Sequence, residues 1–204
     1  TQTIAMLALG EIAYKNPDIQ NTIAKVGGIE ALVTFLKENC KIQIDNIKNE
    51  DETTEKKWTN VNKDLKNTYL PAIKEAVGTL FYLSKIPENQ NIIAESGVIK
   101  ALVTLLKNND NPEIQEVATE SLFNFAKTQA YQVVIGEAGG IEYLVGLLNN
   151  SDNPKVQQAA TRTLFDLAET SANQDRIAEA DGIRQLIILL NNSKNPIVQK
   201  AATR

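Results

Sequence analysis

Residues that commonly carry out catalysis or bind metals are scarce in this chain of 204 residues. It has no histidine and a single cysteine, Cys40. Ser–His and Cys–His pairs activate a nucleophile through an imidazole, and zinc sites need histidines or several thiolates. Such pairs and such zinc sites are therefore excluded within the chain. Catalysis by carboxylates or by lysine stays formally open, and a buried carboxylate pair with a strongly raised pKa would support it.

Glycine-rich segments do not add a phosphate-binding loop. Gly136, Gly139 and Gly140 belong to a turn that recurs in other parts of the sequence. We therefore expect a protein that is not an enzyme and that has no cofactor and no catalytic or metal site. The lone cysteine cannot form an internal disulfide, which favours a reducing compartment and a cytoplasmic location.

Charge and hydropathy narrow the class of partner. The net charge is −4, with both signs mixed among the 23% of residues that are charged, so no basic surface for nucleic acid is expected. No stretch approaches the roughly 20 apolar residues of a membrane span, and residues 1–9 lack the basic start of a signal peptide. We expect partners that are proteins or peptides, without direct membrane insertion.

The chain matches itself when it is shifted by 42 residues. Three isoleucines that open apolar runs keep this step, and so do three prolines: Ile99, Ile141 and Ile183; Pro112, Pro154 and Pro196. A fixed period in this range is typical of a solenoid, because one unit cannot bury its apolar face alone and stacks on its neighbours. An extended stack offers a long surface and seldom a deep reactive cleft. Binding is therefore the expected function.

The first helix of each period is short. One copy covers residues 88–95, with Ile92 and Ile93 as its apolar contacts. Ser96-Gly97 then ends it, since glycine readily takes a positive φ after a helix. The same break recurs as Gly139-Gly140 and Asp181-Gly182.

Two longer helices complete the period. Residues 99–106 place apolar side chains on one broad face of a second helix. Asn111 then caps a third helix of about four turns, and Pro112 lies in its first turn, where a missing N–H costs nothing. Helices so closely spaced leave no room for strands, so the predicted fold class is all-α.

This pattern of short helix, glycine turn, medium helix, Asn-Pro turn and long helix resembles the armadillo repeat of beta-catenin and importin-alpha. Residues 136–169 (GEAGGIEYLVGLLNNSDNPKVQQAATRTLFDLAE) match the family pattern almost position by position. HEAT repeats are the nearest structural competitor, but they are helix pairs without the glycine break. The resemblance implies a right-handed superhelical solenoid with three helices per repeat. It forms a single domain, 1–204, with these parts: a truncated third helix at 1–14, repeats at 16–85, 87–127 and 129–169, and a truncated repeat at 171–204.

The resemblance also implies a binding surface, because third helices line a concave groove in armadillo arrays. In importin-alpha, rows of Trp and Asn side chains there hold an extended peptide, with the Trp rings around lysine stems. On this chain the Trp row falls on Leu7, Gly78, Glu120, Arg162 and Arg204, and the Asn row on Glu11, Tyr82, Asn124 and Asp166. Only Asn124 keeps the family residue, so a nuclear transport receptor is the least favoured alternative.

The same rows remain the candidate contact surface. Lys74, Glu116, Gln158 and Lys200 lie one turn before the Trp row and extend it. The predicted protein-binding residues are Lys74, Gly78, Tyr82, Glu116, Glu120, Asn124, Gln158, Arg162 and Asp166. Tyr82 is the one aromatic residue among them that could anchor a partner. The competing interpretation is that these polar side chains only solvate an exposed helix face.

One repeat is interrupted. Gln20 and Gln90 are 70 residues apart, 28 more than the period, and the extra residues lie at about 41–69. A structureless loop of this length would be unusual in a compact domain. Apolar stripes lead into and out of the segment, so we predict that the second and third helices extend as a protruding hairpin that turns at 49–55. Trp58, near the tip, is either a contact residue or part of the hairpin seam.

These observations predict a scaffold or adaptor that binds partner proteins through the third-helix groove and the insertion. The insertion and the Asn/Lys bias are also similar to those of protozoan scaffolds built from armadillo repeats only. A tether to an organelle membrane, as in those scaffolds, would need segments outside this chain. The second function class is a regulatory or substrate-binding array of a larger enzyme, such as a ubiquitin ligase.

Overall fold

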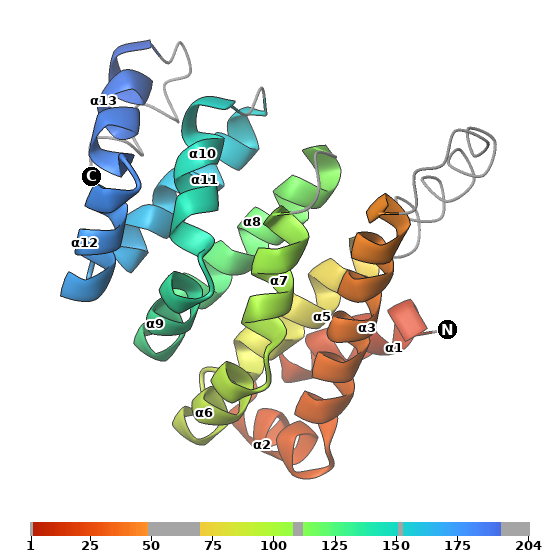
Figure 1. Cartoon of the computed structure of the whole chain (residues 1–204). Helices are drawn as coiled ribbons and strands as arrows, with labels where there is room; N and C mark the ends of the chain where they lie inside the picture. The colour runs from red at the N-terminus through yellow and green to blue at the C-terminus, as the bar shows by residue number, and fades with distance from the viewer. Residues whose placement is uncertain (1, 49–69, 108–111, 151–152, 193–204) are drawn as a thin grey trace, which may run out of the picture. The chain divides into compact units, whose positions relative to one another are not determined.

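A computed structural model describes residues 2–48, 70–107, 112–150 and 153–192. These segments contain twelve helices and no strand (Figure 1), which confirms the predicted all-α class. The helices form two compact units, unit 1 (residues 1–101) and unit 2 (residues 102–204). The boundary between them lies within α7 (Val98–Lys107).

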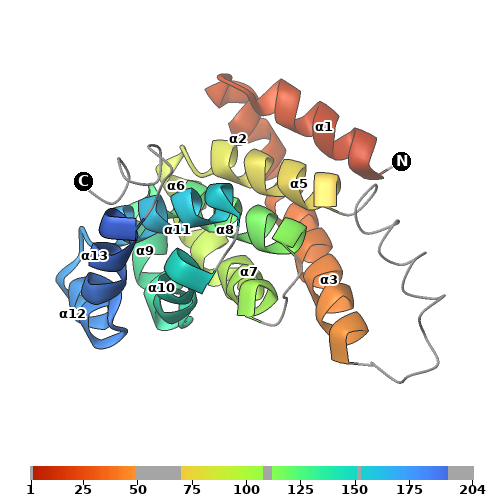
Figure 2. The ribbon, with the colours of Figure 1, turned by 90° about the horizontal axis from the view of Figure 1, so that it is seen from above.

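Unit 1 is built around two long helices that lie side by side. Its helices are α1 (Gln2–Ala13), α2 (Pro17–Lys25), α3 (Gly28–Lys48), α5 (Leu70–Leu83) and α6 (Pro87–Glu95). α1 runs along α5, and α3 packs against α5 as well (Figure 2). Leu36, Ile73 and Leu80 are fully buried between these helices. Each such leucine or isoleucine contributes about 1.5–3 kcal/mol by leaving water.

Unit 2 repeats the same construction. Its helices after α7 are α8 (Pro112–Ala126), α9 (Gln129–Glu137), α10 (Gly140–Asn150), α11 (Pro154–Leu167), α12 (Ser171–Glu179) and α13 (Gly182–Asn192). α8 lies along α11, and α10 packs against α11 (Figure 2). Leu122, Phe125 and Leu148 are fully buried in this core. The apolar faces predicted from the 42-residue period are buried on α7, α8, α10 and α11, whereas Ile183, Ile187 and Leu190 of α13 are exposed.

Glycine turns join the first and second helices, as predicted. Gly97 and Gly139 have φ values of +80° and +76°, a region that side chains with a Cβ seldom adopt. In the last copy the positive φ belongs to Asp181, at 62°, and not to Gly182. Gly182 instead starts α13, where a Cβ would lie 2.7 Å from the carbonyl oxygen of Ile177. Close packing therefore explains this glycine.

The Asn-Pro signal starts helices as predicted. Asn153 Oδ1 accepts a hydrogen bond from the Lys155 N–H at 3.0 Å, and Pro154 is the first residue of α11. Asn16 caps α2 in the same way, accepting from Ile19 N at 3.2 Å. Asn111 lies outside the described residues.

A glutamine links each third helix to the next first helix. Its side-chain amide donates to a carbonyl at the end of the preceding third helix, at 2.7–3.1 Å: Gln20 to Ala13, Gln90 to Ser84, Gln132 to Ala126 and Gln174 to Ala168. The last carbonyls of a helix have no partner within it. The recurring glutamine supplies that partner.

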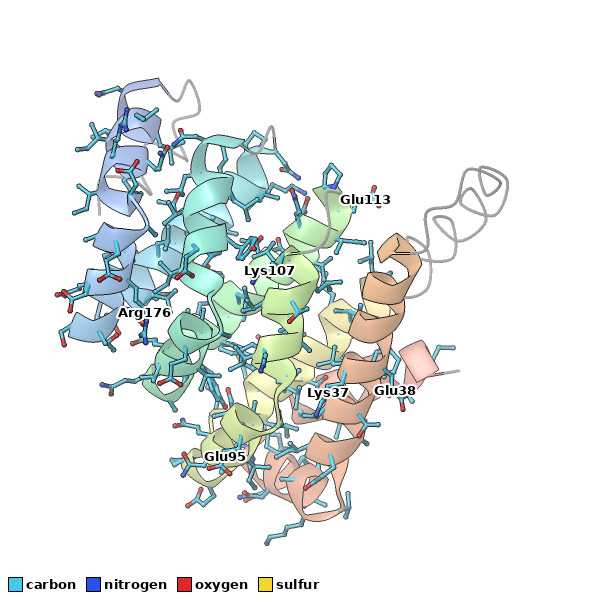
Figure 3. The ribbon with its side chains drawn as sticks, viewed as in Figure 1. Lys37, Glu38, Glu95, Lys107, Glu113 and Arg176 are labelled. Carbon is cyan, nitrogen blue, oxygen red and sulfur yellow. The ribbon has the colours of Figure 1, made fainter. Side chains whose placement is uncertain are left out.

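α6 packs through one of its two predicted contacts. Ile93 is buried, whereas Ile92, on the other side of the helix, is 47% exposed. Lys37 of α3, labelled in Figure 3, donates through Nζ to the carbonyl of Ser96 at 3.0 Å. This charge-assisted hydrogen bond holds the turn after α6 against α3.

The second helix of the interrupted repeat is long, as predicted for the first arm of the hairpin. α3 has 21 residues, whereas its counterparts α7, α10 and α13 have 10, 11 and 11. Residues 49–69 lie outside the described residues. The second arm of the hairpin and the contact role of Trp58 therefore remain predictions.

Candidate protein-binding faces

Three predicted contact residues lie on α5 of unit 1. Lys74 is exposed, and Gly78 and Tyr82 are partly exposed. They follow one another at intervals of four residues, so they share one side of the helix. A Cβ added to Gly78 would meet no atom within 4 Å. The α5 face is therefore open at its centre.

Tyr82 belongs to an aromatic cluster. Its ring meets the ring of Tyr14 edge to face, with 5.4 Å between centroids, and lies 6.0 Å from that of Phe81. Lys15 Nζ lies 4.8 Å from the Tyr14 ring centroid. A hydrogen bond to Tyr14 raises the pKa of Lys15 above its ordinary value. Such rings give a partner a rigid apolar contact.

The predicted row positions on α1 are shifted by one residue. Three buried residues of α1 precede three buried residues of α5 by 70 positions: Met6, Gly10 and Ala13 before Ala76, Leu80 and Leu83. This step places Ala8 and Ile12 in the rows for which Leu7 and Glu11 are predicted. α1 has apolar residues on nearly all sides, so its sequence does not mark the buried face.

The six predicted residues of unit 2 lie on two adjacent helices. α8 carries Glu116, Glu120 and Asn124, and α11 carries Gln158, Arg162 and Asp166. All six are at least partly exposed. Within each helix the spacing is four residues, and the two helices pack side by side. The structure therefore brings these six onto neighbouring stripes, which we call the unit 2 face.

One end of the unit 2 face is held by an ion pair between repeats. Lys155 Nζ lies 3.1 Å from Glu116 Oε1. Asn153, the cap of α11, donates through Nδ2 to Glu116 Oε2 at 3.0 Å. Both carboxylate oxygens of Glu116 are thus engaged within the protein, so this residue contributes to the face mainly by fixing α11 against α8.

Phe123 is a central residue of this face that the predicted rows omit. Lys127 Nζ lies 4.1 Å from its ring centroid, and the guanidinium carbon of Arg162 lies 5.8 Å from it. Both distances suit cation–π attraction. Lys127 also donates to Asn124 Oδ1 at 3.1 Å. The one family-like asparagine therefore has its amide oxygen bound by its own helix.

A period of 42 would have revealed a phenylalanine row. Phe81, Phe123 and Phe165 keep this step, three residues after the Trp row. Lys85 Nζ lies 4.0 Å from the Phe81 ring centroid, in unit 1. Phe165, in unit 2, is 47% exposed. Phe81 and Phe123 are partly exposed and Phe165 is exposed, so a buried core role does not explain the row.

Asp166, on the unit 2 face, has a raised pKa. Burial raises its pKa above the ordinary value of 3.8, and the negative charge of Glu169 adds to this effect. Lys127 and Arg162 act in the opposite direction. Glu169 is exposed and accepts a hydrogen bond from Gln132 Nε2 at 2.9 Å. These two carboxylates are not the buried pair that catalysis would require.

The described segments contain neither a candidate metal cluster nor a candidate membrane span. No group of three or more His, Cys, Asp or Glu side chains there could hold a metal ion. No helix in the same segments is long and apolar enough to cross a bilayer. Trp58, Lys200 and Arg204, which the sequence singles out, lie outside the described residues.

Comparisons with known proteins agree with this architecture. A family model described as Armadillo/beta-catenin-like repeat matches residues 87–127 and 128–169. No curated protein matches the chain significantly. An engineered protein solved by a structural genomics consortium is 30% identical, with a TM-score of 0.61. The match covers 98% of this chain and 87% of that one.

Two designed armadillo repeat proteins share the fold. One, computationally designed for modular peptide recognition, is 21% identical with a TM-score of 0.65, and the match covers 97% of this chain and 71% of that one. The other, in complex with the peptide (KR)4, is 24% identical with a TM-score of 0.60, covering 98% and 89%. The predicted all-α repeat fold is thus confirmed.

Proposed function

Because the chain belongs to the armadillo repeat family, we propose that it is a non-enzymatic scaffold that binds partner proteins. The binding surfaces are the exposed sides of its third helices, and the partners present extended segments to them. The protein acts in the cytoplasm without a cofactor. The insertion after α3 is a second contact element.

The observation that carries this proposal is the unit 2 face. Two packed helices present matching stripes of side chains that are polar and at least partly exposed. Phe123, with Lys127 and Arg162 against its ring, and the exposed Phe165 add apolar area to these stripes. Aromatic and arginine side chains are the types that most often anchor protein interfaces.

The designed relatives support the ligand class. One was designed for modular peptide recognition, and another is in complex with the peptide (KR)4. An extended peptide suits a row of repeats because both have a regular spacing along one direction. We infer that the natural partner of this chain also includes an extended segment.

Affinity capture tests the proposal. The bait is the intact chain, compared with a triple variant, Glu120→Ala with Asn124→Ala and Arg162→Ala, and with a chain lacking residues 42–66. The matched control changes three exposed residues of first helices: Lys25→Ala, Asn91→Ala and Glu137→Ala. The triple variant should lose partners that the intact chain and the control retain. If neither the triple variant nor the deletion alters any captured protein, the proposal is wrong.

A further inference from the structure

Two repeats hold a lysine against a phenylalanine ring in the same way. Lys85 Nζ lies 4.0 Å from the centroid of Phe81 in unit 1, and Lys127 Nζ lies 4.1 Å from that of Phe123 in unit 2. Each lysine follows its phenylalanine by four residues, which is about one helical turn. The same cation–π pair has thus been built at one repeat position twice.

The third copy of this pair lacks its cation. The residue four positions after Phe165 is Glu169, and the ring is 47% exposed. Within the described segments, no lysine or arginine lies over this ring. Arg162, on the preceding turn of α11, is directed toward Phe123, 5.8 Å from that ring. The exchange of lysine for glutamate therefore removes a positive charge and adds a negative one beside an open ring.

Two acids that follow Phe165 in the sequence, Asp166 and Glu169, complement a positive charge. Gln132 Nε2 donates to Glu169 Oε2 at 2.9 Å and holds that side chain in place. A carboxylate has about four lone-pair sites, so Glu169 keeps capacity for a donor from a ligand. Asp166, the next residue after Phe165, is only partly buried. The position that holds a lysine in the other two repeats therefore holds an acid here, four residues after an exposed ring.

We propose that Phe165 and Glu169 form a subsite for a lysine or arginine side chain of the bound partner segment. The partner's cation takes the place that Lys85 and Lys127 occupy on the other two rings. This inference rests on the proposed function and adds to it the chemistry of one partner residue. The subsite is specific to this repeat, because the other two rings already carry a cation of their own helix.

Titration of the full chain with the fluorescently labelled peptide (KR)4 tests the subsite, with a (ES)4 peptide as the acidic counterpart. Phe165→Leu keeps apolar volume but removes the aromatic face, and it should weaken (KR)4 binding about 3- to 10-fold. Glu169→Lys restores the lysine of the other repeats, and it should weaken binding more than about 10-fold, because the ring is then occupied and the like charge repels.

The matched control is Glu179→Lys. It makes the same charge change at an exposed position of α12, and it should alter (KR)4 binding by less than about 2-fold at physiological salt because distant charges are screened. Thermal unfolding followed by circular dichroism checks that each variant folds. Phe165→Leu provides the independent answer if Glu169→Lys does not fold.

Two results would overturn the subsite. One is (KR)4 binding that neither Phe165→Leu nor Glu169→Lys weakens more than the control does. This would leave the proposed function intact, since the peptide would then bind elsewhere on the array. The other is an intact chain that does not bind (KR)4 at all, in which case the capture experiment decides the proposed function separately.

Discussion

The exposed sides of the third helices differ between the two units, although their backbones repeat. In unit 1 the side is aromatic, with Tyr14 and Tyr82 packed edge to face. In unit 2 it is charged, with Lys127 and Arg162 against Phe123. The 42-residue period constrains buried positions because neighbouring repeats must pack on each other, whereas exposed positions vary. Repeat regularity therefore fixes the buried core and leaves the exposed side of each repeat free to differ.

The largest expected loss of stability comes from leucines that are buried at the same repeat position in both units. Leu80 and Leu122 are 42 residues apart and both fully buried. Leu80→Ala and Leu122→Ala should each lower the free energy of unfolding by about 2–5 kcal/mol through lost burial and a cavity. Urea denaturation measures the loss, and hydrogen exchange should show faster opening in the mutated unit first. Costs that differ by more than about 2 kcal/mol would mean that the two cores are not equivalent.

Removing the linking glutamines should lower the free energy of unfolding by different amounts in the two units. Gln132 Nε2 donates to Ala126 O at 3.0 Å and to Glu169 Oε2 at 2.9 Å, whereas Gln20 Nε2 donates to Ala13 O alone, at 2.7 Å. Gln132→Ala should lower the free energy of unfolding by about 1–3 kcal/mol and Gln20→Ala by about 1 kcal/mol. Chemical denaturation of both variants gives the comparison. A larger loss for Gln20→Ala would contradict it.

The cation–π pairs should contribute a smaller and nearly equal amount in each unit. A double-mutant cycle of Phe123→Leu with Lys127→Met should give a coupling of about 0.5–1 kcal/mol. The cycle of Phe81→Leu with Lys85→Met is its partner in unit 1 and should agree. Denaturant titration of the parent, the four single variants and the two double variants measures both couplings. Zero coupling in both cycles would mean that the lysine–ring contacts do not contribute to the stability of the protein.

The smallest effect should appear as a pH dependence confined to unit 2. The fold raises the pKa of Asp166 above 3.8, so the folded state binds this proton more tightly than the unfolded chain does. Ionised Asp166 therefore costs stability once the pH exceeds that raised pKa. Asp166→Asn should add at most about 0.5 kcal/mol at pH 7, and nothing below pH 3.8.

Melting temperatures at several pH values test this, with the exposed Asp175 of α12 as the matched site. Asp175→Asn should leave the pH profile of the parent unchanged. A gain for Asp166→Asn that grows as the pH falls would contradict the argument, since the neutral carboxyl carries no charge to relieve.

Much of the backbone of this fold was predictable because several helix boundaries have a strong local signal. Gly97 and Gly139 take the positive φ that their positions require, and Asn153-Pro154 starts α11 with a side-chain cap. The last turn was less predictable, since either Asp181 or Gly182 could have taken the positive φ. A turn in which only one residue can readily take a positive φ can be predicted from the sequence, whereas a turn with two candidate residues cannot.

The grouping of the candidate residues on the helices was predictable, whereas their side-chain contacts were not. The four-residue spacing correctly grouped Glu120 and Asn124 on one side of α8. That Lys127 and Arg162 converge on Phe123 depends on side-chain reach between helices, which periodicity does not encode. The phenylalanine row keeps the 42-residue period, so the sequence alone contains the signal for it.

The glutamine amides have a consequence for how such chains grow. Each glutamine belongs to the first helix of one repeat, and its amide donates to the end of the third helix before it. A copied repeat therefore brings its own glutamine for this hydrogen bond. A tandem duplication therefore arrives with its coupling already made, and the array can lengthen by whole units without inventing a new contact. Extra sequence placed after α3 lies outside all four of these hydrogen-bonded joints.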